Sequence, residues 1–140
     1  MPAPTRRATR FHSSDTLVKT PQHPPTAAAL ASLDAFEEEH LFKRAGELAP
    51  YFEDAVHSLS ELPHVIDVRN MGLVAGIELE PIPGKPTARA FEVFQRCYEK
   101  GVLIRTTGDI IALSPPLIVT ENQIDEIFTD KMPKVLKSVA

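Results

Sequence analysis

The stretch Val102-Leu103-Ile104-Arg105-Thr106-Thr107-Gly108-Asp109-Ile110-Ile111-Ala112-Leu113-Ser114-Pro115-Pro116-Leu117 decides the fold that we expect for this chain. Val102–Thr106 and Ile110–Leu113 are rich in β-branched and apolar residues, which favour strands, and the Gly-Asp pair between them is typical of a turn. The two prolines end the second strand, because proline has no N–H to donate to a sheet. The stretch therefore predicts a β-hairpin.

Arg105 is the one charged side chain in the first apolar run. A guanidinium on such a strand either lies at a sheet edge, paired with a surface carboxylate, or binds an anion. Spacing alone favours the edge alternative. In the anion alternative, its planar fork of donors would grip both oxygens of a substrate carboxylate, which a lysine cannot do. Thr106 and Thr107 would then add hydroxyl donors.

The chain before this hairpin predicts helices and then a second pair of strands. From Thr26 to Leu62 apolar residues recur at helical spacing, and Pro50 either kinks one helix or begins a second. Val65–Arg69 and Leu73–Leu79 have strand composition, with a turn or bulge between them. Repeated strand pairs with helical connections predict an α+β fold, a small antiparallel or mixed sheet of about four strands covered by helices.

A helix is expected between the two strand pairs, and another at the end of the chain. Thr87 is the candidate N-cap of the first helix, which closes at Lys100-Gly101. The apolar face expected for this helix comprises Ala90, Phe91, Phe94, Cys97 and Tyr98. Thr120 with Gln123 forms a candidate capping box for the last helix, which Pro133 would kink or end. The apolar face expected for the last helix includes Ile124, Ile127 and Phe128.

Composition limits the class of protein. The 140 residues, 43% of them hydrophobic, suffice for one domain with a core. The net charge of -4 argues against a nucleic-acid partner, and no apolar run approaches the roughly 20 residues that span a bilayer. Residues 1–22 are basic and acid-poor, as in an organelle transit peptide or a disordered tail. We expect a disordered tail over 1–22 and a domain over 23–140.

Most residue types that carry chemistry lack a supporting pattern here. The five histidines are scattered, and no nucleotide-binding or nucleophile motif is present, so we expect no metal site and no catalytic residue. Cys97 lies on the apolar face of a predicted helix and is expected to pack. As the only cysteine it forms no intrachain disulfide, which fits a cytoplasmic location.

Five motifs follow one another along the chain: His23-Pro24, Ala27–Leu30, Val68–Leu79, Lys100–Arg105 and Gly108–Leu117. On these residues the chain, from about His23 to the last helix, resembles the C-terminal small domain of class III (ω-amino acid) aminotransferases. The resemblance is strongest to the β-alanine–pyruvate and related ω-transaminases. It implies the small-domain fold of the fold-type I pyridoxal phosphate (PLP) enzymes.

The resemblance also implies a role for Arg105. The arginine at this place in the family holds the α-carboxylate of the amino acid or keto acid, and it swings aside for substrates without a carboxylate. The family's cofactor is pyridoxal 5'-phosphate, and its active site forms between the subunits of a dimer. Arg105 is therefore the expected substrate-binding residue.

The family's large domain, with its Schiff-base lysine, has no counterpart in this sequence. None of the seven lysines stands in that lysine's context; they are Lys19, Lys43, Lys85, Lys100, Lys131, Lys134 and Lys137. We therefore expect no catalysis and no PLP binding by this chain alone, since transamination needs a lysine to carry the cofactor.

Three functions stay open. The chain is part of an ω-amino acid–pyruvate transaminase and inactive alone, or a carboxylate-sensing or docking module for an intact aminotransferase subunit, or a remnant without a role. The expected partners are an amino acid or keto acid carboxylate and a large-domain chain or a second copy of this chain.

Overall fold

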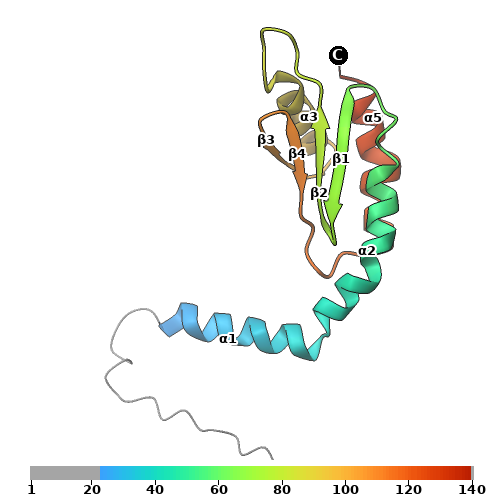
Figure 1. Cartoon of the computed structure of the whole chain (residues 1–140). Helices are drawn as coiled ribbons and strands as arrows, with labels where there is room; N and C mark the ends of the chain where they lie inside the picture. Colours follow the sequence, from blue (N-terminus) through green and yellow to red (C-terminus); the bar gives the residue numbers. More distant parts are fainter. Residues whose placement is uncertain (1–22, 140) are drawn as a thin grey trace, which may run out of the picture. The chain divides into compact units, whose positions relative to one another are not determined.

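The computed structural model describes residues 23–139, which fall into two units (Figure 1). The first unit contains helix α1 (His23–Glu38) and ends at Glu39. The second begins at His40 and contains the remaining elements: α2 (Leu41–His57), β1 (Val65–Met71), β2 (Val74–Leu79), α3 (Ala88–Glu99), β3 (Arg105–Thr107), β4 (Ile110–Leu113), α4 (Glu121–Asp125), the π-helical segment η1 (Glu126–Lys131) and α5 (Met132–Leu136). The tail predicted for residues 1–22 lies outside the described residues.

The four strands form one antiparallel sheet in the order β1-β2-β4-β3, so β1 and β3 are its edges. Each hairpin turns at a glycine with positive φ, Gly72 at 57° and Gly108 at 62°, a backbone conformation that costs other residues more. The predicted α+β fold with a sheet of about four strands is confirmed.

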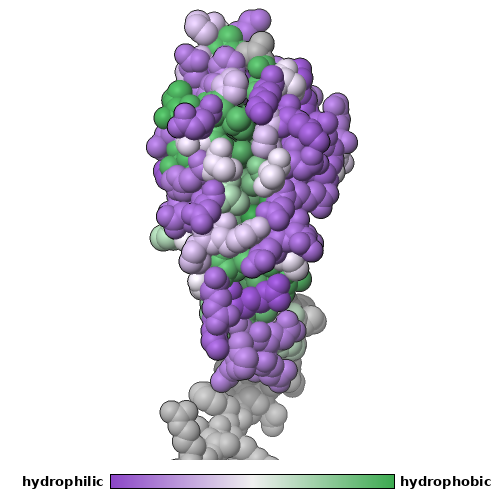
Figure 2. Space-filling model, turned by 90° about the vertical axis from the view of Figure 1, so that its right-hand side faces the viewer, coloured by the Kyte–Doolittle hydropathy of each residue, from purple (hydrophilic) through white to green (hydrophobic). Residues whose placement is uncertain are grey.

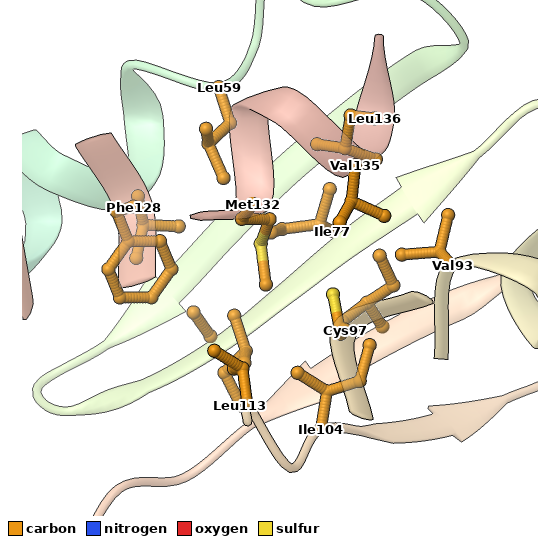
Figure 3. Packing of buried hydrophobic residues seen from close by; sticks show 14 of the residues in the cluster. Leu59, Ile77, Val93, Cys97, Ile104, Leu113, Phe128, Met132, Val135 and Leu136 are labelled. Carbon is orange, nitrogen blue, oxygen red and sulfur yellow. The ribbon is translucent and has the colours of Figure 1, made fainter. Parts of the chain in front are cut away.

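One face of the sheet carries the core, which we call the covered face. Its buried strand residues alternate along β2 and β4: Ala75, Ile77, Leu79, Ile111 and Leu113. Figure 3 shows Ile77 and Leu113 among side chains of the helices, including Met132 and Val135 of α5. The ring of Phe52 meets that of Phe128 edge-on at 5.4 Å between centroids, an arrangement that aromatic pairs prefer. Each such buried side chain contributes about 1.5–3 kcal/mol to folding.

The opposite face of the sheet is covered by no helix of the second unit, and we call it the uncovered face. The alternation of the strands places on it Arg69, Gly76, Glu78, Ala112 and Arg105. All of these residues are exposed or half-buried. The same alternation places Met71, Val74 and Ile110 on this face, so it mixes charged, small and apolar residues, whereas the buried strand residues of the covered face are all apolar.

Helix α2 runs through Pro50 without ending, so of the two alternatives the single helix is the one observed. Its buried residues are Leu41, Phe52 and Val56, with Ala45, Leu48 and Ala55 packed against the core from its margins. The side on which α2 and α5 lie in Figure 1 is seen face-on in Figure 2, where it is mostly hydrophilic. The apolar side of these helices is therefore directed toward the sheet.

Strand β3 is shorter than predicted, because it begins at Arg105 and not at Val102. The amide of Val102 donates instead to the carbonyl of Cys97, and that of Gly101 to Tyr98, which together form a Schellman cap on α3. Gly101, at φ 76°, supplies the left-handed residue that this cap requires. Val102 and Ile104 are buried, yet the helix cap holds the start of this segment away from the ladder.

The first hairpin differs from the prediction in its turn. Asn70 and Met71 belong to β1, and Met71 pairs with Val74, so only Gly72 and Leu73 form the loop. A two-residue loop with glycine at positive φ matches the twist of the paired strands, which is why the strand continues further than its composition predicts.

Two predictions for α3 were wrong. Thr87 sits at the N-cap with φ 68° and its side chain makes no capping hydrogen bond. Phe91 and Tyr98 are 53% and 67% exposed, because the buried stripe follows Ala90, Val93 and Cys97. Each of the two aromatic residues lies one position beyond a stripe residue, about 100° around the helix.

The last helical region keeps its predicted cap, and of the two alternatives for Pro133, a kink or an end, the end is contradicted. Thr120 and Gln123 form the capping box, with Ile124 and Phe128 buried below it. Pro133 does not end the helix, which continues to Leu136. The π-helical segment η1 directly precedes this proline, and its wider turn fits a residue that has no N–H and whose ring clashes with the preceding turn.

Candidate functional site

Arg105 is the first residue of the edge strand β3 and lies on the uncovered face. It pairs with Ala112 of β4, Ala112 pairs with Gly76 of β2, and Gly76 pairs with Arg69 of β1. These four residues form a row across all four strands. Thr107 shares the face of Arg105, whereas Thr106 pairs with the buried Ile111 on the covered face. Of these two threonines, only Thr107 can therefore assist Arg105 in binding a ligand.

Arg105 differs from the other arginines of residues 23–139 in having no recorded partner. Arg44 donates to the carbonyls of Ile118 and Val119 at 3.1 and 3.0 Å. Arg96 donates to Glu92 and Ser138, and the buried Arg89 to the carbonyl of Glu80. Arg69 pairs with two carboxylates, as described next. Edge placement of Arg105 is thus observed, but the surface carboxylate of the edge alternative is absent among the described residues.

Arg69, at the other end of the row, is fully engaged. Its guanidinium lies 2.5 Å from Asp67 and 3.0 Å from Glu78. The hydrogen bonds to Glu78 and then Asp67 raise the pKa of Arg69 above its usual value. Three charges of net -1 lie at this end of the row, so an external anion is better placed at Arg105.

Small residues separate the two arginines. A Cβ added to Gly76 would lie 3.6 Å from Nε of Arg69 and 3.6 Å from Ile110, so the side chain of Arg69 lies over this glycine. Gly76, which has no side chain, thus allows a neighbouring side chain to approach the strand closely. With only a methyl group at Ala112, no side chain stands between Arg105 and the middle of the sheet in this row.

Asp109 is a residue whose contact the sequence alone did not predict. Its carboxylate Oδ1 accepts a hydrogen bond of 2.8 Å from the amide of Thr87, across 22 positions of the chain. Its carbonyl accepts a hydrogen bond from the amide of Leu79 at 2.9 Å. Asp109 thereby joins the β3–β4 turn both to the end of β2 and to the start of α3. Its turn composition gave no signal for this, because the partner lies far away in sequence.

Two alternative kinds of site, a reactive thiol and a metal cluster, find no support among the described residues. Cys97 is buried, and burial raises its pKa to about 11, so the thiol stays protonated at neutral pH. Residues 23–139 contain no cluster of three potential metal ligands. No described helix has the length and apolar character to cross a membrane.

The described lysines do not fit the PLP cofactor that the resemblance implies. Lys43, Lys131 and Lys134 pair with carboxylates one turn away or nearby. Lys85, Lys100 and Lys137 are exposed. No lysine lines either of two shallow hollows, one between α2 and the start of α4 and one along α3. This part of the chain therefore offers no buried amine for an aldehyde cofactor.

Comparisons with known proteins agree on one family. The profile described as aminotransferase class-III matches residues 20–136. An ω-aminotransferase of Caulobacter vibrioides is 61% identical over 101 residues, which are 72% of this chain and 23% of that protein. A β-alanine–pyruvate aminotransferase of Pseudomonas aeruginosa is 35% identical over 119 residues, 84% of this chain and 26% of that protein.

Solved structures give the same result. The ω-transaminase of Pseudomonas jessenii in complex with PMP superposes with a TM-score of 0.73 at 29% identity, over 79% of this chain and 26% of that one. An adenosylmethionine-8-amino-7-oxononanoate aminotransferase of Methanocaldococcus jannaschii gives 0.69 at 33% identity, over 80% of this chain and 27% of that one. The chain spans about a quarter of the length of the relatives it matches.

Proposed function

Because the chain belongs to the class-III aminotransferases, we propose that it is the C-terminal small-domain part of an ω-amino acid–pyruvate transaminase and that Arg105 binds the substrate carboxylate. The observation that supports this most is the state of Arg105. Among the arginines of residues 23–139, it is the one whose side chain makes no hydrogen bond or ion pair with another of these residues. It lies on the uncovered face of the sheet.

The geometry around Arg105 suits a carboxylate. Two parallel N–H donors of its guanidinium match the two oxygens of pyruvate or of an amino acid. Thr107, on the same face, supplies a hydroxyl donor. Because Arg105 is exposed and its neighbour in the row is Ala112, the side chain has room to change rotamer for a substrate that lacks a carboxylate.

We propose further that the chain alone does not catalyse transamination. A carboxylate grip contributes to substrate and transition state alike, so it does not lower the barrier to the chemical step. The described lysines offer no place for PLP, and we derive no step through the cofactor. The purified chain, given PLP, an amine donor and pyruvate, is expected to show no turnover, and turnover by the chain alone would refute this proposal.

A complementation experiment tests the role of Arg105. The Caulobacter ω-aminotransferase is produced without the region that matches this chain, and the full chain is added with PLP. We expect pyruvate-dependent activity with the parent chain and a loss of about 100-fold in kcat/KM for pyruvate with Arg105→Ala, the loss expected when the substrate carboxylate is no longer held. Arg96→Ala, an arginine on the other side of the sheet, is the matched control. Equal activity of the Arg105→Ala and parent chains would contradict the assignment.

The carboxylate-sensing or docking function has its own supporting observation. Helix α1 carries Leu30 and Leu33 at 58% and 60% exposure, and exposed leucines favour a protein partner. This proposal names an intact aminotransferase subunit as the partner. A chain that stays monomeric and does not associate with such a subunit in analytical ultracentrifugation would exclude docking. Loss of carboxylate binding in Arg105→Ala without any association would favour sensing.

A further inference from the structure

We propose that Asp109 is a positioning residue for Arg105: its carboxylate fastens the β3–β4 turn to the start of α3 and thereby fixes the edge strand that presents the guanidinium. The inference rests on the proposed function for the role of Arg105. The fastening itself is an independent claim about the fold. It gives Asp109 a task beyond ordinary turn chemistry.

The start of α3 lacks a cap of its own. Thr87 has a positive φ of 68°, an uncommon conformation for a β-branched residue that persists only when its surroundings fix it. Its side chain bonds no backbone amide of the first turn. In a capping box the N3 side chain would accept the N-cap amide, but N3 of α3 is Ala90, which has no acceptor. Asp109 accepts the Thr87 amide instead, at 2.8 Å.

The charge of Asp109 suits this place. A carboxylate at a helix N-terminus is stabilised by the unpaired amides and by the helix dipole. Helix α3 has 12 residues and no acidic side chain in its first turn, so Asp109 supplies the negative charge from another element. The hydrogen bond lies near the surface, so its effect on stability is that of an ordinary hydrogen bond to a charged acceptor.

Strand β3 needs such a support. It has three residues, lies at the edge and pairs only with β4. On its N-terminal side, the buried Val102 and Ile104 hold it to the core. On its C-terminal side the chain enters the turn at Gly108. From this turn the carboxylate of Asp109 accepts the hydrogen bond from Thr87 at the start of α3. Loss of the Asp109 side-chain contact would leave this turn with its backbone hydrogen bond from Leu79 but without its link to α3, so this end of β3, two residues from Arg105, would open more readily.

The test uses the full chain and three variants. Asp109→Ala removes the acceptor, Asp109→Asn keeps Oδ1 as an acceptor without the charge, and Glu61→Ala removes an exposed carboxylate outside the sheet as a control. Amide hydrogen exchange by NMR reports Thr87, β3 and β4, with β1 as an internal reference. Titration with pyruvate reports binding at Arg105.

Asp109→Ala is expected to accelerate exchange in β3 and at Thr87 by about ten-fold, the factor that one net hydrogen bond represents, and to weaken pyruvate binding several-fold. Compared with Asp109→Ala, Asp109→Asn should restore most of the exchange protection and of the pyruvate binding, and Glu61→Ala should change neither. Unchanged exchange in Asp109→Ala would overturn the fastening. Faster exchange with unchanged pyruvate binding would overturn the positioning role. A parent chain that binds no pyruvate would refute the function of Arg105, while the exchange data would still decide the fastening.

Discussion

The two faces of the sheet are built from the same four strands but differ in almost every physical respect. The covered face is apolar, closed by α2, α3 and α5, and its side chains are buried. The uncovered face is mixed and open to solvent, and its row from Arg69 to Arg105 has a charged residue at each end and small ones in the middle. If the pairing of a strand shifts by one residue, all its side chains move to the opposite face of the sheet. One register of pairing therefore determines both faces.

The comparison separates what stabilises the chain from what recognises a ligand. Buried apolar area supplies most of the folding free energy, and it lies on the covered face. The exposed ion pairs of Arg69 contribute little to stability but keep that arginine occupied. Arg105 has no such pairing among the described residues, which is what a ligand-binding side chain requires.

The largest loss of stability is expected from a substitution in the core on the covered face. Phe128→Ala removes one ring of the edge-on pair with Phe52 and leaves a cavity in the core. We expect a loss of about 3–5 kcal/mol in the free energy of unfolding, measured by urea denaturation followed by circular dichroism. A loss under about 1 kcal/mol would show that this pair does not belong to the core of the fold, and would remove the contrast between the faces.

The pH dependence of the free energy of unfolding tests the burial of Cys97, which packs in the core on the covered face. Burial raises its folded pKa to about 11, whereas an unfolded thiol titrates near about 8.5. The unfolded state releases the proton first, so stability falls as the pH rises from about 8.5 to 11 and is unaffected below that window. We expect a loss on the order of 2 kcal/mol between pH 7 and pH 10.5.

Denaturation of the parent chain and of Cys97→Ala at pH 7 and pH 10.5 measures this loss. The alanine variant cancels all other titrating groups in the comparison, so the difference between the two chains isolates the thiol. If both chains lose equal stability between these pH values, the cysteine is not buried as described.

A smaller loss of stability is expected at the capping box of α4, whose residue Ile124 packs into the core. Thr120→Ala removes the side chain that accepts the amide of Gln123 at 3.3 Å and so opens the capping box of α4. The expected cost is about 1 kcal/mol, measured by thermal denaturation. Thr120→Ser keeps the hydroxyl and should recover most of it. If serine and alanine destabilise alike, the hydroxyl does not cap the helix.

The smallest effect on stability is expected from Arg105. Because the side chain is exposed and has no recorded partner, Arg105→Ala should leave the urea midpoint within error of the parent. A clearly lowered midpoint would mean that Arg105 stabilises the fold through a contact, and the edge alternative with a structural role would then replace ligand binding.

The sequence predicted the covered face better than the uncovered one. The strand composition of Leu73–Leu79 and the residues of the hairpin turns are local patterns, and they predicted the strands within a few residues. The stripe on α3 was misjudged at Phe91 and Tyr98, because residue type does not reveal which side of a short helix meets the sheet. The row from Arg69 to Arg105 depends on strand order, and the contact of Asp109 depends on a partner 22 residues away. Neither is encoded in a local pattern.

The most direct test of the account is a titration of the full chain with pyruvate, observed by NMR at the guanidinium Nε–H of Arg105. We expect a saturable shift of this signal in the parent chain, no comparable shift of Arg96, and no binding by Arg105→Lys, which keeps the charge but loses the fork. An unmoved Arg105 signal at saturating pyruvate, or equal binding by Arg105→Lys, would contradict the claim that this guanidinium holds the substrate carboxylate.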